Sequence, residues 1–236
     1  MHRPVLDIDL SQSEGRLLVA ADIHGRFDSL DRALEEMRYD TRYDTVILIG
    51  DMVDRGHQSH RCLEWIDVPG RYCLKGNHES YIEAVCDGRI SHVEHRQDGG
   101  EWFHLLDETR RNVYRRALTS LPLAARVVTP GNRRVGMIHA DMEGNDFSSF
   151  CGYLRREDHR SEQIAMNGRN RFHAAREGRS VPLIADVDHV FFGHSPVADP
   201  MTVGNCSWID TGLPHSEIAT VLDVDRWISD MSPSTP

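Results

Sequence analysis

Three apolar, β-prone runs in this chain of 236 residues end directly in a short polar cluster. They read LLVAA before Asp22, TVILI before Gly50 and VFF before Gly193, and the shorter runs YCL and VGMI precede two further clusters. A hydrophobic run that stops at Asp, His or Asn is typical of a parallel-sheet strand that delivers ligands at its carboxyl end. We therefore expect the polar side chains to meet at one edge of a sheet. The five clusters are Asp22-Ile23-His24-Gly25, Gly50-Asp51-Met52-Val53-Asp54-Arg55-Gly56, Gly76-Asn77-His78-Glu79, His139-Ala140-Asp141 and Gly193-His194-Ser195.

The clusters supply carboxylate, amide and imidazole donors and no cysteine. This donor set suits a pair of hard or borderline divalent ions rather than a thiolate site. Asp51 is the best candidate for a carboxylate that bridges two cations about 3.5–4 Å apart, and a water shared by them would become a hydroxide able to attack phosphorus. The sequence therefore predicts a two-metal hydrolase. The other candidate ligands are Asp22 and His24 for the first ion, and Asn77, His139 and His194 for the second.

Each cluster by itself has a plainer interpretation. An Asp-x-His pair such as Asp22 and His24 usually marks a polar strand end, and Asn77 could cap a helix. Other histidines, including His57 and His92, are expected to have no ligand role. The metal site is indicated by all five clusters in this order rather than by any one of them.

The composition argues against several classes of protein. A net charge of −10 disfavours a nucleic-acid binder, because affinity for a phosphate backbone needs a basic face. No apolar stretch approaches the roughly 20 residues that span a bilayer, and the start of the chain lacks the order of a signal peptide. The five cysteines have no C-x-x-C spacing and fit reduced thiols. We expect a cytoplasmic enzyme that binds neither nucleic acid nor membrane.

The N-terminal part of the chain alternates strands with helices. Strands are predicted over 16–22, 45–51 and 71–75, with helices over 26–38 and 58–66 between them. This order predicts a parallel α/β arrangement with right-handed crossovers. Further helices are predicted over 79–87 and 108–120.

The pattern changes in the C-terminal part. Strands over 133–139, 188–193, 206–210 and 217–224, with little helix between the last three, predict an antiparallel or mixed half-sheet. The expected fold class is therefore α/β with mixed α+β character. We predict two packed mixed β-sheets flanked by helices, with the metal site at the carboxyl-terminal edge of the strands.

A long segment without clear periodicity follows His139, and segments of this kind are usually functional. Its residues 152–180 hold seven arginines against four acidic residues, in a chain that is acidic overall. These arginines either belong to a solvated loop or place one or two cations over an anionic substrate. We predict one domain over residues 1–230, with a cap at about 142–185 and a disordered tail over 231–236.

The motifs resemble those of the calcineurin-like metallophosphoesterases. The resemblance runs from about Leu17 to Val224 and rests on Asp-x-His-Gly, Gly-Asp-x-Val-Asp-Arg-Gly and Gly-Asn-His-Glu with two later histidines. Within that superfamily the chain looks most like the bacterial and phage serine/threonine protein phosphatases of the lambda phosphatase type, in the PPP family. The Asp54-Arg55-Gly56 extension is the specific part, and the likeness includes a Gly-Gly-x-Trp-Phe segment at 99–103.

The resemblance implies two bound divalent metal ions. Mn²⁺ is the implied activating ion, and a site of nitrogen and oxygen donors could also take iron, zinc or nickel. Water attacks phosphorus directly in this family, so no covalent phosphoenzyme is implied. Asn77 would contact the substrate phosphate as well as a metal. The implied ligands are Asp22, His24 and Asp51 for the first metal, and Asp51, Asn77, His139 and His194 for the second.

The resemblance also implies the catalytic and phosphate-binding residues. His78 would be the general acid that protonates the leaving oxygen, and Asp54 would orient its imidazole. Arg55 would bind the phosphoryl oxygens in bidentate fashion. The second phosphate-binding arginine of the family, in the cap, has its nearest match in Arg169, which follows Met-Asn-Gly, and Arg171 is the rival assignment.

The implied activity is hydrolysis of phosphoserine and phosphothreonine in proteins, with some activity on phosphotyrosine. The first alternative is a symmetrical dinucleoside-tetraphosphate hydrolase or another small-molecule phosphoesterase, which would need an aromatic pocket for a nucleoside. Only Tyr153 and Phe172 stand between residues 152 and 180 to offer one. An alternative from another class is an inactive binding module that keeps the fold, but the presence of all the expected ligands favours an enzyme.

Overall fold

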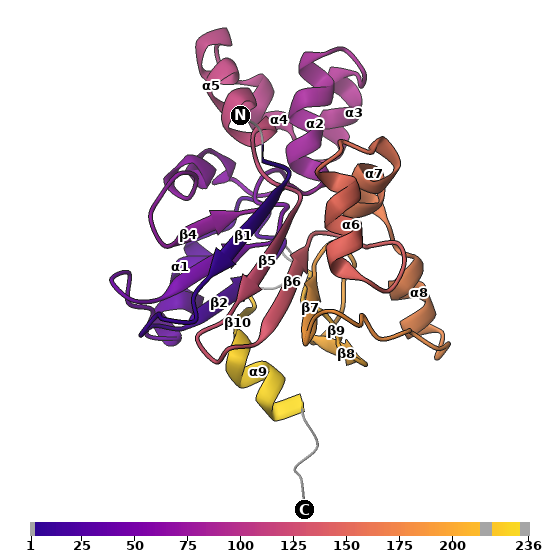
Figure 1. Cartoon of the computed structure of the whole chain (residues 1–236). Helices are drawn as coiled ribbons and strands as arrows, with labels where there is room; N and C mark the ends of the chain where they lie inside the picture. The colour runs from indigo at the N-terminus through magenta and orange to yellow at the C-terminus, as the bar shows by residue number, and fades with distance from the viewer. Residues whose placement is uncertain (1–2, 213–218, 232–236) are drawn as a thin grey trace, which may run out of the picture.

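Two β-sheets face each other and carry helices on their outer sides (Figure 1). The computed structural model describes residues 3–212 and 219–231. Within these ranges the larger sheet has six strands and the smaller sheet has four, which confirms the predicted fold class. The larger sheet runs in the order β1 (Val5–Asp9), β5 (Ala124–Val128), β6 (Arg134–Ile138), β7 (His189–Phe192), β9 (Cys206–Trp208) and β8 (Met201–Val203). The smaller sheet runs in the order β10 (Val221–Asp223), β2 (Leu17–Ala20), β3 (Thr45–Leu48) and β4 (Arg71–Cys73).

The two sheets differ in strand direction. β2, β3 and β4 run parallel, as the alternation of strands and helices predicts. α1 (Phe27–Glu36) connects β2 to β3, and the 3₁₀ helix η1 (Ser59–Glu64) lies between β3 and β4. The larger sheet is mixed, because β6 pairs antiparallel with β5 but parallel with β7.

One predicted strand joins the other sheet. The described part of the predicted strand 217–224 includes β10, which pairs antiparallel with β2 at the edge of the smaller sheet. The prediction that it extends the C-terminal half-sheet was therefore wrong. A strand pattern reports local conformation, whereas the sheet that a strand joins depends on contacts with distant segments, here with β2.

The side-chain period of the inner strands explains the layers of the core. Leu17 and Val19 of β2 pack between the two sheets, whereas Leu18 and Ala20 on the opposite face pack against the outer helices. Every residue of β2 and β3 is buried. A strand covered on both faces reads as a continuous apolar run rather than an alternating one, which is the pattern seen before Asp22.

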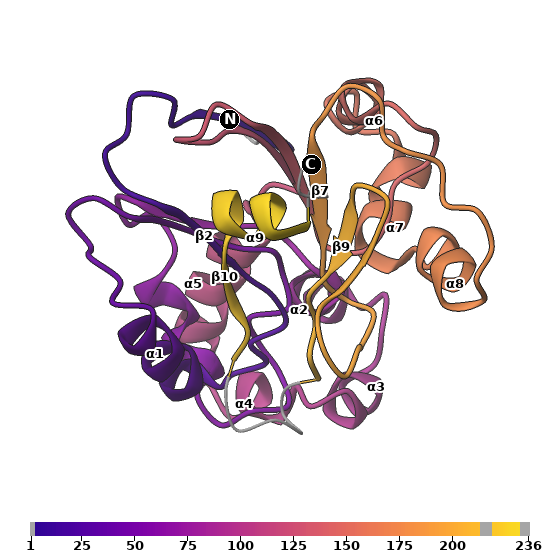
Figure 2. The same ribbon diagram turned by 90° about the horizontal axis from the view of Figure 1, so that it is seen from below.

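The helices divide between the outer faces of the two sheets (Figure 2). The smaller sheet is covered by α1, α2 (Asn77–Cys86) and α5 (Glu108–Thr119), and the short α3 (His92–Gln97) and α4 (Glu101–His104) lie between α2 and α5 along the chain. The larger sheet is covered by α6 (Phe147–Leu154), α7 (His159–Asn167) and α8 (Asn170–Arg176). α9 (Val224–Met231) contributes Val224 and Ile228 to the core between the sheets.

The segment after His139 is not a loop. It forms α6, α7 and α8, and Phe147, Phe150 and Phe172 of these helices are buried in the core of the larger sheet. The helices are only 8, 9 and 7 residues long. Helices this short show little periodicity in the sequence and depend on tertiary packing for their stability. The solvated-loop interpretation of this segment is therefore wrong.

Two further predictions concern the chain end and the membrane. Met231 is the last residue of α9, and the rest of the predicted tail lies outside the described residues. Among the helices that the structure describes, none combines the length and the apolar character that a bilayer span requires.

Candidate metal centre and catalytic site

The carboxyl ends of strands from both sheets deliver the motif residues to one cavity. Asp22 follows β2, Asp51 follows β3, and Asn77 opens α2 after β4. His139 and His194 follow β6 and β7 of the larger sheet. The cavity has a volume of about 370 Å³, and Asp22, Asp51, Asn77 and His194 line it. The polar clusters therefore do meet at one edge, where the two sheets come together.

Two groups of side chains at this place could each hold a metal ion, and they share Asp51. His24, Asp51 and His78 form one group, and Asp51, His139 and His194 form the other, with ligand atoms within 4.8 Å of one another in each group. Asp51 Oδ2 is 3.7 Å from His24 Nε2, and Asp51 Oδ1 is 3.4 Å from His139 Nε2. One carboxylate thus faces both groups, as a residue that bridges two divalent ions would.

Backbone carbonyls orient two of the imidazoles. His24 Nδ1 lies 3.1 Å from Val53 O, and His139 Nδ1 lies 2.9 Å from Ile49 O. In each case Nδ1–H donates to the carbonyl, which leaves Nε2 directed at Asp51. Metal-binding histidines commonly have their second nitrogen fixed in this way. The donor set of nitrogen and oxygen atoms, with no thiolate, fits a pair of divalent ions.

The oxygen acceptors around His139 favour a positive charge at this place. His139 Nε2 is 3.1 Å from Asn77 Oδ1 and also faces the Asp51 carboxylate. Burial alone would lower the pKa of His139, but the charge of Asp51 outweighs it and raises the pKa to about 10. The oxygens that stabilise a proton at this place would also bind a divalent ion, and ion binding would then release the proton.

Asp22 takes part in the cavity but in neither of the two groups. Its carboxylate accepts the backbone N–H of His194, with distances of 3.1 and 2.9 Å to the two oxygens. Burial and the nearby Asp210 carboxylate raise the pKa of Asp22 well above its usual value. Two buried carboxyl groups side by side favour a bound cation, because a cation relieves their mutual repulsion.

The backbone at the site is strained. Asp22, His24, Asp51, Asp54, Arg55 and His194 all have positive φ values, between 45° and 69°. This left-handed conformation is uncommon for residues other than glycine, and such strain concentrates at functional sites. At the ends of different strands, these left-handed backbone conformations direct side chains toward the cavity.

His78, a member of the first candidate group, forms a buried pair with Asp54. His78 Nδ1 lies 2.9 Å from Asp54 Oδ2, and His78 and Asp54 are 1% and 0% exposed. Burial alone would lower the pKa of His78, but the charge of Asp51 and the hydrogen bond to Asp54 outweigh it, so the pKa is raised. A raised pKa keeps a proton on this imidazole near neutral pH, as a general acid requires.

The site geometry agrees with the comparison to known families. The calcineurin-like phosphoesterase family model matches residues 15–228. The chain belongs to this family. The family is one of phosphoesterases. Most of the motif residues of this chain line one cavity, as an active site would require.

Individual relatives of this phosphoesterase have two kinds of name. The chain is 30% identical over 200 residues to serine/threonine-protein phosphatase 1 of Salmonella typhimurium, which covers 82% of this chain and 85% of that protein. It is 29% identical over 168 residues to a symmetrical bis(5'-nucleosyl)-tetraphosphatase of Methylococcus capsulatus, over 64% of this chain and 60% of that protein. A solved serine/threonine phosphatase from Saccharomyces cerevisiae has a TM-score of 0.62 at 14% identity, over 89% of this chain and 72% of that one, and shares the fold.

Two arginines line the phosphoesterase cavity. Arg55 Nη1 lies 2.9 Å from His24 Nε2, and Arg55 Nη2 lies 3.1 Å from His78 Nε2. Arg169 precedes α8 in the segment 142–185, lines the same cavity, and donates from Nη2 to His194 O at 3.3 Å. Arg55 and Arg169 are both exposed, so their guanidinium groups are accessible to a ligand.

Arg171 is not at the phosphoesterase site. Its side chain is buried, and its guanidinium donates to Pro182 O and Gly144 O, both at 2.7 Å. Its backbone N–H also donates to Asp141 Oδ2 at 3.0 Å. These contacts join α8 to the segment before α6 and to the segment between α8 and β7. Arg171 is therefore a structural residue, and the rival assignment of the phosphate clamp to it is not supported by its position.

Sequence reasoning gave no role to two residues that support the site. The carboxylate of Glu79 accepts hydrogen bonds from the backbone at the end of β3 and at the start of α2, including one of 2.9 Å from Asp51. His95 on α3 lies 3.2 Å from Asp54 Oδ2. Glu79 belongs to the Gly-Asn-His-Glu motif, so the signal for it was visible. His95 has no such motif, because only the fold brings it to Asp54.

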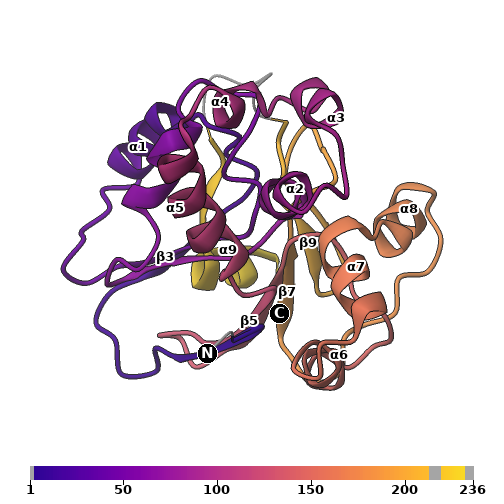
Figure 3. The same cartoon turned by 90° about the horizontal axis from the view of Figure 1, so that it is seen from above.

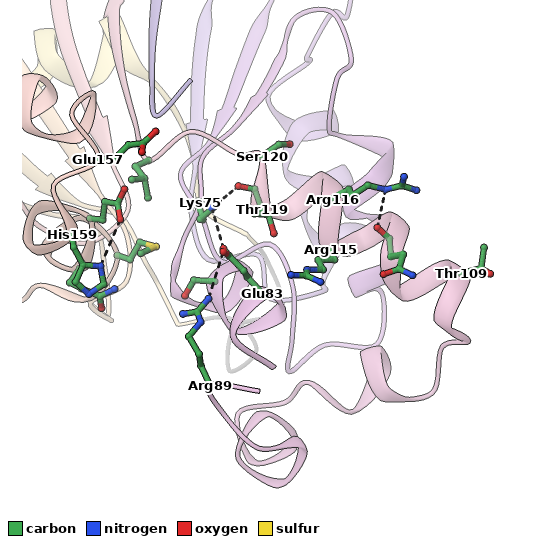
Figure 4. A pocket seen from close by; sticks show the side chains of 16 residues that line it. Lys75, Glu83, Arg89, Thr109, Arg115, Arg116, Thr119, Ser120, Glu157 and His159 are labelled. Atoms are coloured by element: carbon green, nitrogen blue, oxygen red, sulfur yellow. Dashed lines mark hydrogen bonds and ion pairs between the residues drawn. The ribbon is translucent and has the colours of Figure 1, made fainter. Parts of the chain in front are cut away.

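A larger groove of the phosphoesterase lies elsewhere. Its volume is about 1170 Å³, and its lining includes residues of α2, α5 and α7. Figure 3 shows where these three helices lie. Lys75 Nζ donates to Thr119 O at 2.6 Å and lies 4.0 Å from Glu83 in its wall (Figure 4). Arg89 in turn lies 3.6 Å from Glu83. We place the site in the smaller cavity, because the metal-binding groups and the His78–Asp54 pair are there.

Proposed function

We propose that this phosphoesterase hydrolyses phosphoserine and phosphothreonine monoesters in proteins, with phosphotyrosine as a lesser substrate. The observation that carries the proposal is the His78–Asp54 pair beside the shared carboxylate of Asp51. A serine or threonine alkoxide leaves poorly unless it is protonated, so a positioned acid contributes roughly 10²–10⁴-fold to the rate. The similarity to a serine/threonine-protein phosphatase of Salmonella typhimurium over most of both chains supports the same substrate class.

The proposed metal ligands are taken from the two groups around Asp51, with Asp22 and Asn77 added and with His78 kept free to act as the acid. Two divalent ions bound there would lower the pKa of a water and neutralise charge on the phosphoryl oxygens. We propose Mn²⁺ as the activating ion, although iron, zinc and nickel also accept such donors. The proposed ligands are Asp22, His24 and Asp51 for one ion, and Asp51, Asn77, His139 and His194 for the other.

The remaining residues would bind the phosphate and move one proton. Arg55, Arg169 and Asn77 all line the cavity, so the two guanidinium groups and the amide of Asn77 would bind the phosphoryl oxygens. His78 would give the proton on Nε2 to the leaving oxygen. Asp54 would stabilise the charged imidazole before this transfer and hold its ring plane.

The domain and compartment assignments are part of the same proposal. We propose one domain over residues 1–230, with 142–185 as its cap, and a cytoplasmic location. The cap assignment is supported by Arg169, which extends from this segment to the cavity. The cytoplasmic location is supported by five free cysteines, of which Cys86 alone is exposed.

A symmetrical tetraphosphatase is the alternative activity, because a relative of that name is similar to part of the chain. A nucleoside would need an aromatic surface next to the metals. Phe172 is buried against Trp208, and Tyr153 is on α6 with Arg156 over its ring, so neither lines the cavity. Tyr81 is the one Tyr, Phe or Trp side chain among the described residues that line it. The cavity therefore offers less to a nucleoside than to a phosphoryl group on a protein surface.

The test is a side-by-side assay of a phosphoserine peptide and diadenosine tetraphosphate with Mn²⁺ at equal enzyme concentration. We expect a higher kcat/KM on the peptide and no turnover of either substrate after metal removal. A higher kcat/KM on the tetraphosphate would replace the proposal with the alternative. Tight binding of the phosphopeptide without turnover in Mn²⁺ would indicate an inactive binding module.

A further inference from the structure

The carboxylate of Asp54 is held by more donors than the general acid alone. Its Oδ1 accepts the indole N–H of Trp102 at 2.7 Å. Its Oδ2 accepts from His78 Nδ1 at 2.9 Å and lies 3.2 Å from His95 Nε2. Asp54 and His95 are both 0% exposed, so bulk water does not compete for these hydrogen bonds. The angle of the carboxylate, and with it the ring of His78, depends on these donors.

The backbone of Gly99 and Gly100 packs closely around His95 and the residues beside Asp54. The backbone N–H of Gly100 donates to His95 O at 2.9 Å, and a Cβ on Gly100 would overlap the His95 ring. The neighbouring Gly99 accepts the backbone N–H of Arg55 at 3.1 Å. The double glycine therefore lets the segment approach both the imidazole of His95 and the backbone beside Asp54.

A second histidine lies beside the other ring nitrogen of His95. His95 Nδ1 lies 3.0 Å from His104 Nε2. Burial and the neighbouring His95 lower the pKa of His104 to about 4, so His104 is neutral near pH 7 and carries one ring proton. The Asp54 carboxylate can only accept, so His95 must present N–H at Nε2, and its Nδ1 accepts from Nε2 of the neutral His104. The proton of His95 is then on Nε2, where it points at Asp54.

We propose that His95 is a positioning residue, which donates from Nε2 to Asp54 and thereby holds His78 in line with the leaving oxygen. This inference rests on the proposed function, because it concerns protonation of an alkoxide leaving group. His95 does not line the cavity itself, and its hydrogen bond to the proposed acid–carboxylate pair is made to Asp54.

The test compares two variants of His95 on two substrates. In His95→Leu the side chain keeps a similar size but loses the donor, whereas the amide of His95→Gln can still donate to Asp54. We expect His95→Leu to lower kcat on a phosphoserine peptide by roughly 10- to 100-fold, because a small misplacement of a catalytic group costs that much. The loss on p-nitrophenyl phosphate should be much smaller, since nitrophenolate leaves without a proton. His95→Gln should restore most of the peptide activity.

The matched control is His92→Leu on the same helix. His92 is exposed, and its contact is with the ring of His104 at a centroid distance of 4.7 Å. It should leave kcat on both substrates near the wild-type value. Equal losses on both substrates in His95→Leu, or equal effects of the Leu and Gln variants, would overturn the proposal in favour of a packing role. Wild-type enzyme that cleaves the nitrophenyl ester but not the phosphopeptide would instead overturn the proposed function.

Discussion

The buried carboxylate of Glu79 accepts a 2.9 Å hydrogen bond from the backbone N–H of Asp51. The same carboxylate accepts the N–H groups of Met52 and Gly76, each at 2.8 Å. Glu79 therefore ties the turn after β3, where Asp51 has a strained φ of 51°, to the first turn of α2. Through these three hydrogen bonds Glu79 fixes the backbone of Asp51, whose carboxylate is shared by the two candidate metal groups.

Removal of the Glu79 side chain should destabilise both the fold and the metal centre. Glu79→Ala leaves three buried N–H groups without their acceptors, at about 1–3 kcal/mol each, so we expect a loss of about 3 kcal/mol or more. Urea denaturation measures the stability, and Mn²⁺ titration of the folded protein measures the affinity. Glu83→Ala on the same helix is the control, because Glu83 makes only longer, partly exposed ion pairs. Equal stability of the two variants would contradict this role of Glu79.

Asp51→Asn should weaken binding of both metal ions and lower kcat by orders of magnitude. The reason is that Asp51 is the carboxylate common to the two metal-binding groups. Metal stoichiometry, measured by calorimetric titration with Mn²⁺, and kcat on a phosphopeptide check the prediction. Full turnover by this variant, or by the metal-free wild-type enzyme, would rule out a shared two-metal site.

Arg169→Ala should raise KM and lower kcat without changing stability. Its guanidinium lines the cavity, is exposed, and makes one hydrogen bond of 3.3 Å to His194 O. Contacts to phosphoryl oxygens strengthen as charge develops on them, so both constants are affected. Steady-state kinetics at saturating Mn²⁺ measure the change. An arginine that is only solvated would leave KM and kcat as they are.

Arg171→Ala should show the opposite behaviour. The buried guanidinium of Arg171 donates to Pro182 O, Gly144 O and Asn145 Oδ1. Truncation leaves these acceptors unsatisfied, and we expect a loss of roughly 2–4 kcal/mol in the free energy of unfolding. The KM of the protein that remains folded should stay near the wild-type value. A large rise in KM with unchanged stability would instead assign the role of second phosphate-binding arginine to Arg171.

His189 should make stability depend on pH. It is 3% exposed, it lies 2.7 Å from Ser207 Oγ, and burial lowers its pKa to about 4. The unfolded chain, with a histidine pKa near 6.5, binds the proton more strongly, so stability falls as the pH drops from about 6.5 to about 4. Between pH 7 and pH 5 this one group costs about 2 kcal/mol.

The measurement for His189 is urea denaturation at pH 7 and pH 5 in the wild type and in His189→Gln. Other groups titrate in the same range, so the relevant quantity is the difference between the two pH dependences. The variant should lose less stability on acidification than the wild type. Identical pH dependence in both proteins would mean that His189 is protonated equally in the folded and unfolded states.

The sequence identified the elements whose signals are local. The apolar runs before Asp22 and Gly50 are strands that are buried on both faces, and such strands give an uninterrupted hydrophobic run. α1 and α5 were visible because each presents one apolar face over several turns. The polar clusters could be placed together because the ends of parallel strands share one edge.

The parts that the sequence could not determine depend on contacts between distant segments. The three helices after His139 are too short to show a helical period in the sequence. The pairing of β10 with β2 joins segments that are distant in the sequence, so no local pattern predicts it. Arg169 and Arg171 are alike in the sequence, yet one lies at the cavity and the other is buried, because α8 starts between them.

By itself, therefore, the sequence determined the α/β class, the candidate donor set and the family likeness. The tertiary structure decided which side chains support those donors. Glu79 is 28 residues from Asp51, and His95 is 41 residues from Asp54. A hydrogen bond depends on distance and angle in space, so the Gly-Asn-His-Glu motif marks Glu79 without showing its contact with Asp51, and no motif marks His95.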